Sequence, residues 1–275
     1  MRASVVLMLL LHSFSRSSGS SIKGKASLLR TPPSIAAMMG EVASSIRAAK
    51  DSDSNPLPLP IALVELPLPV TGGTELDDWP GGIKQKYATL VPMLKETMKQ
   101  LAFSPTEQSS SPQYIGDCGE EDSVGYFADE SLGIQLICFP TLDTIPAIQD
   151  LLAKNAEKEN GSLIVLINQN FYTDPFTPSN AKDFISSIET IYQIENLNVK
   201  GTAGLSVRGL LYRRFPEDWS VGRRLDEGGY ERIAVMARKP SRKELDDFFY
   251  TDSLERDKNL SLLDRLKKQI PRFGD

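Results

Sequence analysis

The apolar run from Ser162 to Ile167 constrains the fold of this chain more than any other segment. After Ser162 the run reads LIVLI, which contains only leucine, isoleucine and valine. Strands of this composition are buried on both faces, as in a parallel sheet that is covered by helices on each side. We therefore expect Ser162–Ile167 to be the central strand of such a sheet.

Helical and strand-like patterns alternate along the chain before and after this strand. The elements that we expect are a helix through 35–46, a strand at Pro60–Leu68, a helix from Asp77 or Asp78 to Leu101, strands at Ser123–Phe127 and Gly133–Phe139, a helix at Ile145–Ala156 and a helix that buries Phe184, Ile185, Ile188, Ile191 and Tyr192. Pro92 predicts a kink or break near Leu90 in the second of these helices. This alternation favours βαβ units and a parallel sheet.

The C-terminal third of the chain has a different pattern. Three segments, Gly204–Arg214, Trp219–Arg224 and Arg232–Ala237, alternate as in an antiparallel meander, and Ser241 with Glu244 forms a capping box for a last helix. We therefore predict an α/β fold, a three-layer sandwich with a mixed, largely parallel central sheet and a C-terminal antiparallel meander. It would form a single domain over residues 33–250, followed by a tail at 251–275 with a short amphipathic helix.

Residues 1–30 carry five basic side chains and no acidic one. The apolar run Val5–Leu11 has the length of the core of a signal peptide and is too short to span a bilayer. The serine-rich, basic stretch after it has the composition of an organelle transit peptide. We expect a bipartite leader that directs the protein to the plastid (chloroplast), in the stroma or on the stromal face of the thylakoid. Plain secretion with a serine-rich spacer is the alternative.

Loss of that leader would change the formal net charge from −5 to −10, because five positive charges leave with it. An acidic chain without a dense Lys/Arg block is a poor partner for nucleic acid. The only histidine, His12, lies in the leader, and Cys118 and Cys138 have no CxxC spacing. Histidine-dependent catalysis and ordinary zinc sites are therefore excluded, and we expect no metal, no cofactor and no assigned catalytic residue.

Four polar residues are candidates for a ligand or partner site. Asn168 ends the central strand, and Asp174 lies in the loop after it, at the edge where open α/β sheets place their ligands. Glu65 is an acid within an apolar strand, so its carboxylate needs a raised pKa or a cation, and Arg213 or Arg214 is the obvious cation. The structural alternatives are an Asn168 that closes a turn and a Glu–Arg pair that only supports the fold.

The loop Thr71–Thr74, TGGT, lies between a strand and a helix and suggests phosphate binding. It lacks the lysine of a Walker motif, and Asp77 and Asp78 would repel an anion. Nucleotide binding therefore rests on a weak signal.

Short segments throughout the chain resemble a known family: VELPLP at 64–69, VLINQNF at 165–171, GLLYRRFPEDWSV at 209–221 and ARKPSRKELDDFF at 237–249. They are similar to the domain-of-unknown-function family nineteen-ninety-five, from about Pro33 to Tyr250. Its members include cyanobacterial and plastid proteins, and a plant photosystem II assembly factor is similar over the same region. The resemblance implies a chloroplast setting and leaves the chemistry open. The chain departs from the family where Gln169, in place of proline, follows Asn168.

Two functions are compatible with these features. The first is a non-catalytic binding or assembly factor that recognises a protein partner in thylakoid or photosystem II complexes. Its peripheral membrane contact would be made by the C-terminal tail, where basic residues accompany Leu263, Leu266 and Ile270 at helical spacing. The second is a small-molecule or nucleotide-dependent enzyme that uses the C-terminal edge of the sheet.

Overall fold

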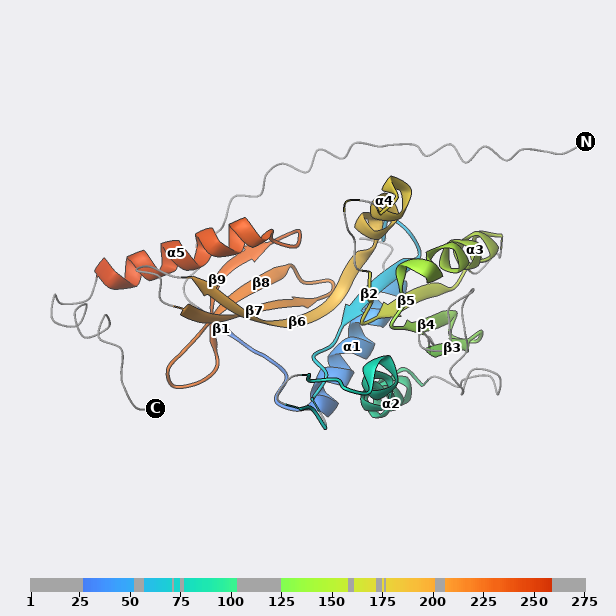
Figure 1. Cartoon of the computed structure of the whole chain (residues 1–275), viewed down its shortest axis with the longest axis horizontal. Coiled ribbons are helices and arrows are strands. Elements are labelled where there is room, and N and C mark those ends of the chain that lie inside the picture. The colour runs from blue at the N-terminus through green and yellow to red at the C-terminus, as the bar shows by residue number, and fades with distance from the viewer. Residues whose placement is uncertain are drawn as a thin grey trace, which may run out of the picture.

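The computed structural model describes residues 27–51, 57–70, 72–74, 77–102, 125–157, 161–171, 175, 177–200 and 206–258. These residues form one nine-stranded mixed sheet in the order β1-β9-β8-β7-β6-β2-β5-β4-β3 (Figure 1). The strands are β1 Leu28–Leu29, β2 Ile61–Glu65, β3 Gly125–Asp129, β4 Ile134–Cys138, β5 Leu163–Ile167, β6 Glu189–Lys200, β7 Ser206–Arg214, β8 Trp219–Arg224 and β9 Tyr230–Met236. The helices are α1 Ile35–Lys50, α2 Gly82–Leu101, α3 Ile145–Ala156, α4 Ser179–Ser187 and α5 Arg242–Lys258.

One half of the sheet is built from the parallel strands β4, β5, β2 and β6, with β3 added antiparallel at the edge. Helices α1 and α2 cover one face of this half, and α3 and α4 cover the other (Figure 1). All five residues of β5 are buried. The expectation that this strand is buried on both faces is thus confirmed, because every side chain of LIVLI meets a helix layer.

The other half of the sheet is the antiparallel meander β6-β7-β8-β9. Strands β7, β8 and β9 correspond to the predicted meander, whereas β6 was not predicted. Helix α5 packs on the face that also carries α3 and α4, and it forms a separate hydrophobic cluster with Leu211, Trp219 and Val221 (Figure 1). The capping box of α5 is present, since Ser241 Oγ accepts from the backbone N–H of Glu244 and Glu244 Oε2 accepts from the backbone N–H of Ser241. The predicted α/β class with a C-terminal antiparallel meander is therefore confirmed.

We expected the helix after β5 to continue to Tyr192, and this prediction is wrong beyond Ser187. Helix α4 ends there, and β6 begins at Glu189. The apolar residues recur at a spacing that fits a helix, but the segment also alternates with period two and contains β-branched residues that favour a strand. Pairing with both β2 and β7 decides between the two patterns.

Helix α2 also differs from its prediction. It begins at Gly82 instead of after Asp77 or Asp78, because Asp77 Oδ1 accepts a hydrogen bond from the backbone N–H of Trp79 and so closes a local turn. The helix runs through Pro92 without a break.

The described elements extend beyond both expected ends of the domain, residues 33 and 250. Leu28–Leu29 pair with β9, and Leu29 is buried against Gly222, so the sheet begins within the segment 1–30 that was expected to be a leader. At the other end α5 continues to Lys258, past the expected boundary at residue 250, and the expected helix of the tail lies outside the described residues.

Candidate functional site

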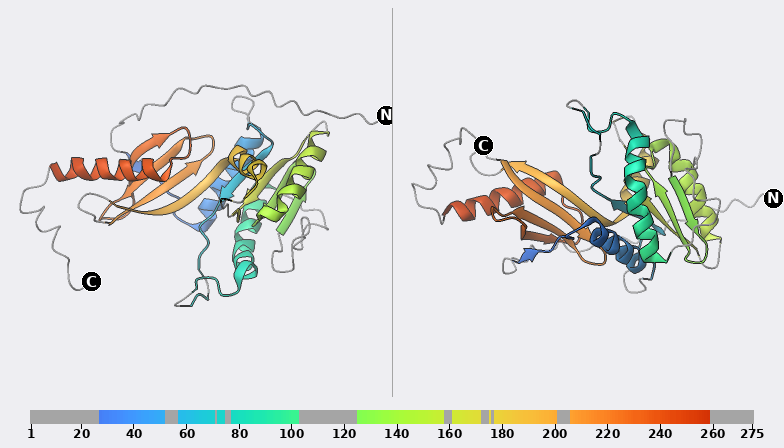
Figure 2. Two further views of the ribbon diagram at one scale, coloured as in Figure 1. Left: turned by 45° about the horizontal axis from the view of Figure 1, so that its top comes forward. Right: turned by 90° about the horizontal axis from the view of Figure 1, so that it is seen from below.

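The carboxyl ends of β2 and β5 lie side by side and send the chain to opposite faces of the sheet. After β2 the chain continues to α2 on one face, and after β5 it continues to α4 on the other (Figure 2). Such a point, where neighbouring strands lead to opposite faces, is a topological switch point, and open α/β sheets generally bind ligands there. The predicted residues Glu65 and Asn168 both lie at this edge.

The side chain of Asn168 bridges the two strand ends. Its Oδ1 accepts from the backbone N–H of Leu66 at 2.7 Å, and its Nδ2 donates to the backbone carbonyl of Leu66 at 3.0 Å. The backbone N–H of Asn168 donates to the carbonyl of Val64, so the side chain extends the β2–β5 pairing by one further residue. Asn168 has φ of 51°, which asparagine tolerates better than most residues. Its polar atoms therefore join two strand ends.

Glu65, on the neighbouring strand β2, is a mostly buried carboxyl group. Its Oε1 is buried with no hydrogen-bond partner among the described residues. The nearby Gln169 favours the charged form of the carboxyl group. Burial raises the pKa of Glu65 to about 7, against the opposing effects of Lys239 and Gln169. Glu65 is therefore a carboxyl group that changes its charge near neutral pH.

A row of polar residues crosses the sheet from Glu65. Glu65 pairs in register with Gln193 of β6, and Gln193 pairs with Arg213 of β7. Paired residues project to the same face, so the row lies on the face that carries α4 and α5. It falls between the hydrophobic cluster under α3 and α4 and the cluster under α5.

The expected pair between Glu65 and Arg213 or Arg214 is not formed. Arg213 is buried and binds Glu189, with Nη2 to Oε1 at 3.1 Å. It also donates to the backbone carbonyls of Thr190 and Glu217. The register explains the difference, because Gln193 stands on β6 between Glu65 and Arg213.

Arg214 lies on the opposite face, in a second polar cluster around Glu41 of α1. Glu41 Oε2 accepts from the hydroxyl groups of Tyr192 at 3.0 Å and Tyr212 at 2.8 Å, and Oε1 lies 3.6 Å from Arg214 Nη1. Burial is the main cause that raises the pKa of both tyrosines above the ordinary range, so they stay protonated. This cluster fastens α1 to β6 and β7.

Among the groups that act on Glu65, the Lys239 ammonium lowers the pKa of this carboxyl group the most. Lys239 belongs to the connector between β9 and α5, and its Nζ donates to Gln193 Oε1 at 3.0 Å. The same ammonium lies 5.6 Å from the centre of the Trp219 ring, and Arg213 lies 5.9 Å from that ring. Gln193 in turn donates to Glu195 Oε2 at 2.7 Å. The site therefore combines one titrating carboxyl group, two cations and a buried indole.

The sequence prediction missed three of these residues, Gln169, Gln193 and Lys239. The only signal among them was that Gln169 replaces a proline next to Asn168, and no signal in the sequence indicated Gln193 or Lys239. Trp219 is a packed aromatic residue and is 2% exposed. Asp174 lies outside the described residues.

The glycines of the TGGT loop are not at a helix N-terminus. Thr74 bonds to Asp77, and α2 begins only at Gly82, so the arrangement expected for phosphate binding is not formed by Gly72, Gly73 and Thr74. Thr71 lies outside the described residues.

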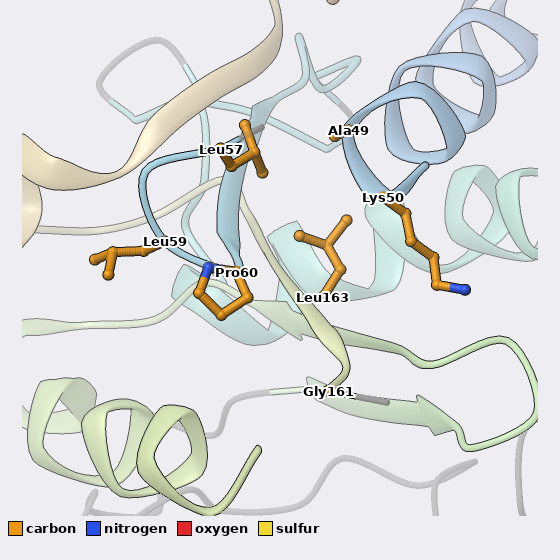
Figure 3. Close-up of a pocket in the computed structure, with 7 residues that line it drawn as sticks. All are labelled: Ala49, Lys50, Leu57, Leu59, Pro60, Gly161 and Leu163. Carbon is orange, nitrogen blue, oxygen red and sulfur yellow. The ribbon is translucent and has the colours of Figure 1, made fainter. Parts of the chain in front are cut away.

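Two hollows in the surface lie away from the polar row. One of about 250 Å³ is at the amino ends of β2 and β5, where Leu57 and Leu163 project toward the same space and the Lys50 amino group extends away from it (Figure 3). The other, of about 290 Å³, lies between the segment 31–38 and strands β6, β7 and β9. Neither is lined by Glu65, Asn168 or Arg213.

Within the described ranges, His, Cys, Asp and Glu form no group of three or more that could hold a metal ion. Cys138 is buried in β4, and burial raises the pKa of its thiol. Among the helices of the described part, none combines the length and apolar character needed to cross a membrane.

Comparison with family models matches residues 24–247 to DUF1995, a domain of unknown function. The chain belongs to the DUF1995 family. The match starts before β1 and ends within α5, so DUF1995 spans the whole described sheet. Searches of curated proteins and of solved structures returned no match.

Proposed function

We propose that this DUF1995 protein is a non-catalytic binding or assembly factor that acts on thylakoid or photosystem II complexes in a plastid. One observation carries the proposal: two of the three described candidate residues already have partners within the fold. Asn168 is bonded to Leu66, and Arg213 is bonded to Glu189. An active site directs its polar groups toward a shared space that a substrate can enter, and these groups line neither hollow.

The composition of residues 1–26 supports the plastid setting. The segment has an apolar run followed by serine-rich, basic sequence without an acid. Fused to a fluorescent protein, it should deliver the reporter into a plastid, and deletion of Val5–Leu11 should block entry. Intact fusion protein in the culture medium would contradict the plastid setting and favour secretion.

The partner is tested with a tagged full chain expressed in plastid-bearing cells. Immunoprecipitation from mildly solubilised thylakoids should enrich photosystem II subunits over abundant stromal proteins. The matched variant lacking residues 259–275 tests the membrane contact of the tail, because this change leaves every described element in place. It should lower the membrane-bound fraction at low salt. Equal recovery of thylakoid and stromal proteins by the full chain would contradict the assembly role.

The second candidate function is an enzyme that uses the carboxyl edge of the sheet. One observation favours it, the pKa of about 7 of Glu65, which suits a general base at neutral pH. A thermal-shift series with nucleotides and small metabolites separates the two functions. A saturable shift that Glu65→Gln abolishes would support the enzyme, whereas the binding role predicts no shift with these ligands.

A further inference from the structure

In the cluster around Glu65, the carboxyl group of Glu65 and the ammonium group of Lys239 are not paired with each other. Within the described part of the chain, Glu65 Oε1 is buried and has no hydrogen-bond partner. Lys239 lies within reach of the same row, but its Nζ is bonded to the neutral oxygen of Gln193 and lies over the Trp219 ring. The arrangement suits a protonated Glu65, since a buried carboxylate without a cation is strongly disfavoured.

The charged groups that face Glu65 come from two elements. Lys239 from the β9–α5 connector favours the carboxylate, and Glu195 from β6 opposes it. The turn after β5 contributes the neutral Gln169, and β6 also contributes the neutral Gln193, which separates Glu65 from Arg213. Arg213 is occupied by Glu189. Among the described residues, Lys239 is therefore the cation that can answer a change of charge on Glu65.

Lys239 is also well placed to transmit such a change. Its side chain is long and the residue is exposed, and it stands two residues before Ser241, the cap of α5. Gln193, its present partner, is the register neighbour of Glu65. A shift of the ammonium by one strand spacing would exchange one partner for the other.

We propose that Glu65 and Lys239 form a proton-controlled latch between the carboxyl edge of β2 and the connector to α5. With Glu65 protonated, Lys239 rests on Gln193 and Trp219. When Glu65 releases its proton to water, the ammonium moves to Oε1, leaves the indole and draws the connector toward β2. The pKa of Glu65, raised by burial to about 7, sets this exchange near neutral pH.

Trp219 reports the position of Lys239. The chain has two tryptophans, so Trp79→Phe leaves Trp219 as the only one. In this background the emission of Trp219 should change with a single transition centred near pH 7, because the cation leaves the ring. Glu65→Gln and Lys239→Met should each abolish the transition. Glu195→Gln should keep it and move its midpoint to lower pH, since a repelling charge is removed.

Amide hydrogen exchange at fixed pH gives a second readout that does not depend on the indole. The connector 237–241 should exchange at different rates in the parent and in Glu65→Gln at about pH 8, and at equal rates at about pH 5.5. Glu65→Gln imitates the neutral carboxyl group, so its fold should be kept. The latch would be overturned if the connector exchanged at the same rate in the parent and in Glu65→Gln at both pH values. An emission transition that persists in Glu65→Gln would overturn it as well.

Discussion

The two halves of the sheet are stabilised in different ways. In the parallel half every residue of β4 and β5 is buried between two layers of helices. In the meander, of the seven residues of β9 only Ala234 is buried, and α5 covers one face. The polar row Glu65, Gln193 and Arg213 lies where the two helix-covered clusters end. Glu65, whose pKa is raised to about 7, therefore lies at the boundary between the two halves, between their hydrophobic clusters.

The largest effect is expected from an acid placed in the parallel half. Val165→Asp buries a carboxylate at a fully buried position in β5, which costs several kcal/mol of the about 5–15 kcal/mol that hold a domain together. The variant should be unfolded by circular dichroism. The matched Val235→Asp, at a half-buried position in β9, should stay folded with a lower melting temperature. If both variants melted alike, the contrast between the halves would be wrong.

Weakening the contact between α5 and the meander should destabilise this part of the molecule before the parallel half. Phe249 of α5 is fully buried, and its ring lies so close to Gly209 of β7 that a Cβ there would approach it to 2.1 Å. Phe249→Ala should cost about 3–5 kcal/mol and speed amide exchange in α5 and β7–β9. Phe248→Ala, at a partly buried neighbour, is the control and should have a smaller effect. Faster exchange in β5 to the same extent would show that the two halves unfold together.

Stability should depend on pH through Glu65. Its folded pKa of about 7 is above its ordinary value of 4.5, so the favourable contribution is fully present below 4.5 and is lost as the pH rises through 7. Relative to Glu65→Gln, the parent should lose about 3 kcal/mol of unfolding free energy between about pH 4 and pH 8. Urea unfolding across this range measures the difference. Lys239→Met should enlarge the loss, and an identical pH profile in Glu65→Gln would refute the assignment.

The smallest expected effect concerns the link between the strand ends. Asn168→Ala removes two hydrogen bonds to Leu66 and places a less tolerant residue at a φ of 51°, which together should cost about 1–3 kcal/mol. Asn168→Gly removes the same bonds but accepts the backbone conformation. The difference between the two melting temperatures isolates the contribution of φ. If Asn168→Gly matched the parent, the bonds to Leu66 would contribute nothing to stability.

The sequence by itself determined the elements whose signal is local. The run LIVLI predicted a doubly covered strand, the alternation from 219 to 224 predicted β8, and Ser241 with Glu244 predicted the cap of α5. These signals suffice because the residues that make the pattern also make the contacts. Glu65 and Asn168 were selected in the same way, from their positions in or at the end of an apolar strand.

Only the tertiary structure decided which polar groups meet. Ile191 and Tyr192 were predicted to belong to a helix, but they lie in β6, and the pairing of β6 with β2 and β7 places Gln193 between Glu65 and Arg213. Lys239 reaches the row because β9 ends beside it, 174 positions along the chain from Glu65. Such contacts depend on strand order and register, which no local pattern encodes. The same long-range register set the pKa of Glu65, because burial by segments far away in the chain raises it.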